Sequence, residues 1–155
     1  MLVADGAQAA HEVGRGSIEA AFALHRFQDD GGHALGFDVA LEEADDVIFG
    51  YTLFNDVTAR DIQRQEGKFT RAKGYDTFAP IGPWIDTEFS PDRQSLDVTV
   101  NGELRQHGRL DEMIFSIPEL IVAVSGFMTL HPGDIIATGT PSGVAPLNAG
   151  DVVTV

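Results

Sequence analysis

Three polar side chains follow an apolar run near the middle of the chain, at a spacing that suits chemistry. Asp56, Arg60 and Gln63 lie on one face if Asn55 caps a helical turn that runs through Arg64. A carboxylate can hold a hard cation, Arg can bind a substrate carboxylate through two parallel hydrogen bonds, and Gln can orient a carbonyl or a water. The alternative interpretation is an ordinary solvated Asp–Arg helix pair, worth about a few tenths of a kcal/mol.

Basic residues gather just downstream of this trio. The chain has 24 acidic and only ten basic residues, for a formal net charge of −14, yet half of its bases fall within fourteen positions: Arg60, Arg64, Lys68, Arg71 and Lys73. Such a cluster in an acidic protein predicts a local anion site, with Lys73 as a point charge for an oxyanion. The overall negative charge argues against nucleic acid as a partner.

A second candidate is the loop from Ala137 to Val144, in which glycines flank two hydroxyl side chains after an apolar run. Gly139 and Thr140 can bring backbone amides and a hydroxyl close to a ligand oxygen. A plain turn is the competing interpretation. The five histidines show no metal-ligand spacing, and only His11-Glu12 suggests acid–base work.

The elements that must position these residues can be read from pattern. Val47 to Phe54 predicts a buried strand, and Phe78 to Ile85 a strand or loop interrupted by prolines. Two alternating runs from Leu96 to Gln106, joined at Asn101-Gly102, predict a hairpin with a type I′ turn. Ser116 to Leu130 predicts a helix capped by Ser116, with Pro118 and Glu119 in its first turn.

The remaining segments predict more strand than helix. Strands are expected at 133–138 and from Asp151 onward, 18–24 suits either a strand or a short helix, and the first sixteen residues are expected to form a loose arm. The chain therefore predicts an α+β fold in which strands predominate. No signal peptide, membrane-spanning segment or cysteine is present in the sequence, so we expect a cytoplasmic protein without disulfides or a membrane partner.

Several motifs together resemble the fumarylacetoacetate hydrolase family. They occur in the family's order between Val47 and Val155, namely Gly50 to Gln63, Arg71 to Trp84, Val98 to Gly102, and Leu130 to Val144. The resemblance implies the family's mixed β-roll or β-sandwich with short helices, a Mg²⁺ or Mn²⁺ ion and a homodimer. It also implies a small oxo-acid substrate.

The resemblance assigns roles residue by residue. Asp56 matches the metal-binding aspartate, Arg60 and Gln63 the substrate-contacting pair, Lys73 the lysine of a family motif, and Thr140 the threonine of the Gly-Thr-Pro loop that begins at Gly139. On this basis Lys73, Arg60 and Gln63 are the predicted catalytic residues. The same three, with Gly139 and Thr140, are the predicted substrate-binding set.

The first part of the chain departs from the family pattern. Ser17-Ile-Glu19 stands where the family has a Glu-x-Glu pair, so Glu19 is the second predicted metal ligand and Ser17 replaces the first glutamate. His11-Glu12 does not align with the family's His and Glu dyad. We therefore expect a divergent N-terminal segment, residues 1–46, and a family-like core, residues 47–155, in a single domain shortened at both ends.

The resemblance implies hydrolysis of carbon–carbon bonds in β-diketo or acylpyruvate acids through a metal-stabilised enolate. One alternative is isomerisation or decarboxylation of the oxo-diene diacids of aromatic catabolism, as by a 2-hydroxyhepta-2,4-diene-1,7-dioate isomerase. The other is a catalytically silent homologue with an incomplete metal site.

Overall fold

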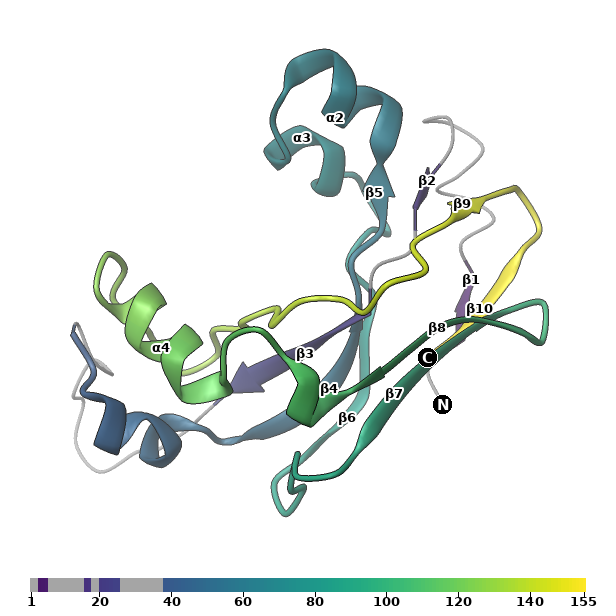
Figure 1. Ribbon diagram of the computed structural model, residues 1–155. Helices are drawn as coiled ribbons and strands as arrows, with labels where there is room; N and C mark the ends of the chain where they lie inside the picture. The colour runs from purple at the N-terminus through teal and green to yellow at the C-terminus, as the bar shows by residue number, and fades with distance from the viewer. Residues whose placement is uncertain (1–2, 6–15, 18–19, 26–37) are drawn as a thin grey trace.

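The computed structural model describes residues 3–5, 16–17, 20–25 and 38–155 (Figure 1). Its helical elements are η1 (Leu41–Val47), α2 (Arg60–Glu66), α3 (Thr70–Lys73), η2 (Leu110–Glu112) and α4 (Ile117–Ser125). Its strands are β1 (Val3–Asp5), β2 (Gly16–Ser17), β3 (Ala20–His25), β4 (Gly50–Asn55), β5 (Thr58–Ala59), β6 (Ile81–Asp86), β7 (Ser95–Val100), β8 (Glu103–Arg109), β9 (Pro146–Leu147) and β10 (Val152–Thr154). The α+β fold with predominant strand is confirmed.

The strands form three sheets in the described part of the chain. One sheet has the order β1-β10-β7-β8, a second β3-β4-β6, and a third, of two-residue strands, β5-β2-β9. Figure 1 shows α2 and α3 projecting from one end of β5, while α4 and η1 lie at the far end of β4. The segment before β9 runs across the middle of the molecule between these two ends.

The predicted hairpin is confirmed as β7 and β8. Asn101 and Gly102 both have positive φ, 53° and 83°, as a type I′ turn requires. The Asn101 side chain also donates to Asp151 (2.8 Å) and accepts from the Val152 amide (2.9 Å), which ties the turn to β10. Alternate residues of β7, namely Leu96, Val98 and Val100, are buried. They form one hydrophobic cluster with Leu147 and Val153.

The predicted capped helix is confirmed as α4, but it is shorter than expected. Ser116 and Glu119 form a capping box, and Ile117 and Ile121 pack against Val39 and Ala44 in a second cluster. The helix ends at Ser125 instead of Leu130, because Gly126 is a poor helix former. Beyond it Phe127 and Met128 are exposed and add no buried face.

Other boundaries also differ from expectation. The strand predicted from Val47 begins at Gly50, because 41–47 coil into the 3₁₀ helix η1. The segment 18–24, open between strand and helix, forms strand β3 from Ala20, and Val3–Asp5 of the expected arm pairs with β10. The strand predicted at 133–138 is wrong, since these residues form a turn and an irregular segment. None of the helices in the described ranges is long and apolar enough to cross a membrane.

Candidate active site

Asp56 lies in the short connection between β4 and β5. The Asn55 amide donates to the carbonyl of Pro80 (3.1 Å), and the Thr58 hydroxyl donates to the Asp56 carbonyl (3.1 Å). Val57, Thr58 and Ala59 are buried. The Asp56 side chain is 15% exposed, so its carboxylate stands at the edge of this core with access to solvent.

The predicted helical turn from Asn55 is wrong. α2 begins at Arg60 after Ala59, with no side-chain cap, because Thr58 and Ala59 are extended and pair with Ser17 and Gly16 of β2. Asn55 is instead fully buried, and neither polar atom of its side chain has a hydrogen-bond partner among the described residues. Asp56 therefore precedes the helix and does not share its face.

Lys73 at the end of α3 contacts Asp56. Its ammonium pairs with Oδ2 of that carboxylate and lies 5.1 Å from the centroid of the Phe69 ring. Ala72, fully buried, anchors α3, and the Lys73 side chain remains 32% exposed. A half-buried ammonium beside a carboxylate and an aromatic face is held more firmly than a surface lysine.

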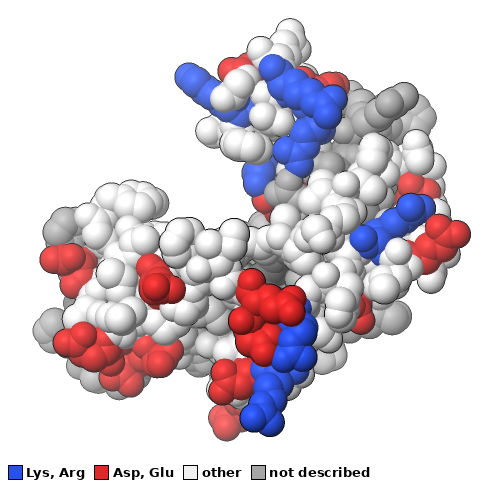
Figure 2. All heavy atoms as spheres, viewed as in Figure 1, with Lys and Arg blue, Asp and Glu red and all other residues white. Residues whose placement is uncertain are grey.

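Arg60 and Gln63 lie one turn apart on α2, as predicted. An Arg60 guanidinium nitrogen donates to Gln63 Oε1 (3.4 Å), so the two side chains share a face of the helix. Figure 2 shows Lys and Arg side chains gathered over α2 and α3, where the sequence predicted a basic cluster. Within it Arg71 pairs with Glu66 at 2.6 Å.

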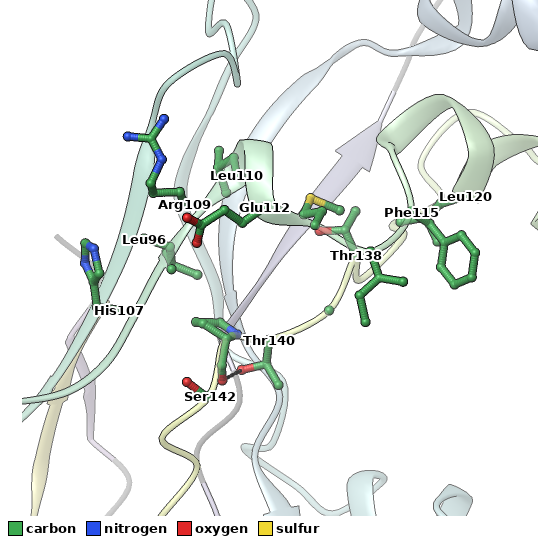
Figure 3. Close-up of a pocket in the computed structure, with 15 residues that line it drawn as sticks. Leu96, His107, Arg109, Leu110, Glu112, Phe115, Leu120, Thr138, Thr140 and Ser142 are labelled. Atoms are coloured by element: carbon green, nitrogen blue, oxygen red, sulfur yellow. Dashed lines mark hydrogen bonds between the residues drawn. The ribbon is translucent and has the colours of Figure 1, made fainter.

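The loop that carries Gly139 and Thr140 lies on β8. Gly139 has φ of 121°, and the exposed Thr140 hydroxyl accepts a hydrogen bond from Nε2 of the buried Gln106 (2.8 Å). The loop lines a cavity of about 400 Å³ whose apolar walls come from β7, η2 and the start of α4 (Figure 3). No sequence pattern indicates Gln106, because in the hairpin pattern it is an ordinary strand residue.

The sheet β5-β2-β9 connects the two groups of predicted residues. Thr58 of β5 and Pro146 of β9 both pair with Ser17, so β5 and β9 run parallel on either side of β2, about 10 Å apart. Asp56 precedes β5 and Thr140 precedes β9, so both segments enter the sheet from the same end.

The donor set around Asp56 fits a hard divalent cation in kind, because such ions bind carboxylate oxygens. It is incomplete in number, since no cluster of three or more acidic, His or Cys side chains occurs within the described ranges. The other predicted ligand, Glu19, lies outside the described residues, as do His11 and Glu12. The ladders β3–β4 and β2–β5, which lie on the two sides of Asp56, have the same register.

Comparison with known proteins identifies the class. The family model for the fumarylacetoacetate (FAA) hydrolase C-terminal domain matches residues 33–155. The chain belongs to the fumarylacetoacetate hydrolase family, as its motifs suggested.

Individual relatives differ in reaction. The chain is 52% identical over 112 residues to an oxaloacetate tautomerase of Bacillus subtilis, covering 70% of this chain and 37% of that protein. A crystal structure of 2-hydroxyhepta-2,4-diene-1,7-dioate isomerase from Mycobacterium marinum has a TM-score of 0.83 at 43% identity, covering 92% of this chain and 55% of that one. A maleylpyruvate hydrolase from Sphingobium sp. SYK-6, in complex with manganese(II) and pyruvate, has a TM-score of 0.77 at 38% identity, covering 90% and 50%.

The chain spans about half the length of the curated relatives that it matches, 49% of the first and 46% of the second. Its relatives include hydrolases, isomerases and decarboxylases, so membership of the family does not by itself distinguish among these three reactions.

Proposed function

We propose that the chain carries the core of an enzyme that forms and stabilises the enolate of a small oxo-acid. The contact between Lys73 and Asp56 carries this proposal, because it places an ammonium beside a carboxylate next to the helix that presents Arg60 and Gln63. A positive charge held in a partly buried position stabilises a negative charge that grows on a substrate oxygen.

Each predicted residue has a distinct role in this proposal. Arg60 binds the substrate carboxylate, and Gln63 orients the neighbouring carbonyl by donating from its amide. Lys73 donates to the oxygen on which the enolate charge develops. Thr140 and the backbone amide of Gly139 hold the substrate from the opposite loop.

A divalent cation, Mg²⁺ or Mn²⁺, would supply Lewis-acid polarisation of the substrate carbonyl when bound. We propose Asp56 and Glu19 as its protein ligands. The shared register of the two ladders supports the choice of Glu19. In the sequence Glu19 lies between β2 and β3, and Asp56 lies between their pairing partners β5 and β4. The manganese complex of the related maleylpyruvate hydrolase supports the choice of a divalent metal.

For the reaction, we propose hydrolysis of a carbon–carbon bond in an acylpyruvate-type acid, in which the enolate is the leaving group. Isomerisation is the second candidate, favoured by the 52% identity to an oxaloacetate tautomerase and by the isomerase structures among the neighbours. Enolate formation and reprotonation are sufficient for isomerisation, whereas hydrolysis also needs an activated water.

The test combines metal binding with turnover. The chain is mixed with Mg²⁺ or Mn²⁺ and an acylpyruvate, oxaloacetate or an oxo-diene diacid, and the products are resolved by NMR. Cleavage of the acylpyruvate into pyruvate and a second acid supports the hydrolase, loss of CO₂ from oxaloacetate indicates a decarboxylase instead, and a moved double bond or an enol–keto shift without cleavage supports the isomerase. The absence of turnover on all three substrates would overturn the proposed function and favour a silent homologue.

The same samples report on the metal. The melting temperature is expected to rise with millimolar metal. The free energy of unfolding increases by about 2.7 kcal/mol when the metal concentration is one hundred times the dissociation constant. Asp56→Asn removes this shift. Asp61→Asn, on the exposed first turn of α2, is the matched control and keeps it.

We further propose that the chain functions as a cytoplasmic homodimer. The apolar surface that the described residues expose near α4 supports the dimer.

A further inference from the structure

Gln106 is the only residue of β8 whose side chain is fully buried. It is 1% exposed, whereas its neighbours along the strand are exposed or half-buried. A long polar amide seldom occupies such a position, because its donors and acceptors must find partners away from water.

A β-bulge turns this side chain inward. In the β7–β8 ladder Val98 pairs with Gln106 and Thr99 with Leu104, so Arg105 is an extra residue on β8. A bulge of this kind redirects the side chain beside it, and bulges often lie next to active sites.

The Gln106 amide uses both of its hydrogens on the Thr140 loop. Nε2 donates to the Thr140 hydroxyl oxygen (2.8 Å) and to the carbonyl of Pro141 (2.8 Å). Because a carbonyl oxygen only accepts, the second bond fixes which end of the amide faces the loop. The Thr140 hydroxyl in turn donates to the same Pro141 carbonyl (3.5 Å), so the Gln106 amide, the hydroxyl and the carbonyl form one small network.

The loop packs so closely against β8 that two contact points leave no room for a Cβ. A Cβ on Gly143 would lie 2.1 Å from the carbonyl oxygen of Arg105, and a Cβ on Gly108 would lie 2.6 Å from the Pro141 Cβ. Both contacts need glycine, on opposite sides of Gln106.

Gln106 Oε1 is buried and has no hydrogen-bond partner among the described residues. Methionine would fill the same space without a buried unpaired acceptor. The NH₂ group, which holds the loop, is therefore the part of the Gln106 side chain that makes hydrogen bonds.

The geometry points to Gln106 as a positioning residue for Thr140: its NH₂ group holds the Thr140 hydroxyl oxygen and the Pro141 carbonyl, and so fixes where the loop presents Thr140. This inference rests on the proposed oxo-acid function, in which Thr140 contacts the substrate. Gln106 itself does not contact the reacting atoms.

The test is a double-mutant cycle. Gln106→Met is expected to lower kcat/KM about ten- to one-hundredfold, the range expected when a contacting group is misplaced by about 1 Å. Thr140→Val is expected to lower it to a similar degree, and the double variant no further, because both remove the same contact. Gln94→Met, an exposed glutamine just before β7, is the control and keeps wild-type rates.

Two NMR signals report on the positioning independently of turnover. The Gln106 side-chain amide protons should exchange slowly in the wild type and faster in Thr140→Val, and the Thr140 methyl signal should shift in Gln106→Met. If Gln106→Met does not fold, the Thr140→Val measurement decides, because Thr140 is exposed.

The outcomes separate this inference from the proposed function. Absent turnover in the wild type, with the NMR coupling present, overturns the function and retains the positioning contact as structure. An active wild type in which losses add in the double variant, or in which the Thr140 methyl ignores Gln106→Met, overturns the positioning role.

Discussion

At the residue scale, the site depends on one ion pair whose members have competing partners. Lys73 contacts the same Asp56 carboxylate that we propose as a metal ligand. A fixed positive charge a few ångströms from a divalent cation opposes its binding, while it favours an anionic substrate. In the proposed site, Lys73 would therefore weaken metal binding while it stabilises the negative charge of the substrate.

Lys73→Met is predicted to tighten Mn²⁺ binding about tenfold, because the ammonium no longer repels the cation or occupies the carboxylate. The same change should lower kcat by at least about a hundredfold, because the enolate loses its charge partner. Calorimetry measures the first effect and a turnover assay the second. Lys68→Met, exposed between α2 and α3, serves as the control, and equal Mn²⁺ affinity in Lys73→Met and wild type would contradict the competition.

The sequence predicted only part of the geometry at this scale. The i, i+3 relation of Arg60 and Gln63 was correct because both lie inside a regular helix. Asp56 was misplaced on the same helix, because pairing with β2, a contact distant in sequence, keeps Thr58 and Ala59 extended. Gln106 was missed because a bulge leaves no mark on an alternating pattern.

At the element scale, the start of α4 and the loop before β9 are the most informative. α4 begins with a reciprocal cap in which Glu119 accepts from the Ser116 amide (2.6 Å) and hydroxyl (2.7 Å). The Ser116 hydroxyl, and after it the Ser116 amide, hold the pKa of Glu119 below its usual value. Local signals of this kind are readable from sequence, which is why this helix start was predicted correctly.

The cap predicts a pH dependence. The pKa of Glu119 is lower in the folded state than in the unfolded state. The stability that its ionised carboxylate contributes is therefore fully present above the unfolded pKa, about 4.3, and is lost as the pH falls through the folded pKa. Glu119→Gln should therefore reduce the fall in melting temperature below about pH 4.3. Melting curves from pH 3 to 7 measure this, with the exposed Glu88→Gln as the control. Parallel acid limbs for Glu119→Gln and wild type would contradict it.

The loop before β9 offers a matched glycine pair. Gly143 and Gly150 have similar positive φ, 105° and 91°, but only a Cβ at Gly143 meets backbone, whereas at Gly150 nothing lies within 4 Å. Gly150→Ala should cost about 1 kcal/mol of unfolding free energy from strain, and Gly143→Ala about 3 kcal/mol or more. Urea unfolding gives both values. Equal losses would show that the loop moves freely off β8.

At the scale of the whole molecule, the chain has an acidic surface, a local basic region on α2 and α3, and a group of exposed apolar side chains around α4. Ile114 is 92% exposed and Phe127 70%. Large apolar side chains that are exposed to this degree support the proposed dimer, because apolar patches often form interaction surfaces. Neither pattern nor spacing could predict this surface, because exposure depends on which elements meet.

The dimer proposal gives a prediction at this scale. Ile114→Asp should shift the chain from dimer to monomer in light scattering at micromolar concentration, because a charge is costly in an apolar interface. Leu104→Asp, which alters an apolar residue on β8 that is 59% exposed, is the control and keeps the dimer. A wild-type chain that is monomeric in this measurement would overturn the proposal.

The sheet β5-β2-β9 has a consequence for the order of folding. Its strands are two residues long and come from the first, middle and last parts of the chain, so their pairing closes long loops for few hydrogen bonds. The hairpin β7–β8, by contrast, closes over a two-residue turn and can form early. Because Asp56 leads into β5 and the Thr140 loop leads into β9, we expect these two segments to be brought together late in folding, after the hairpin has formed.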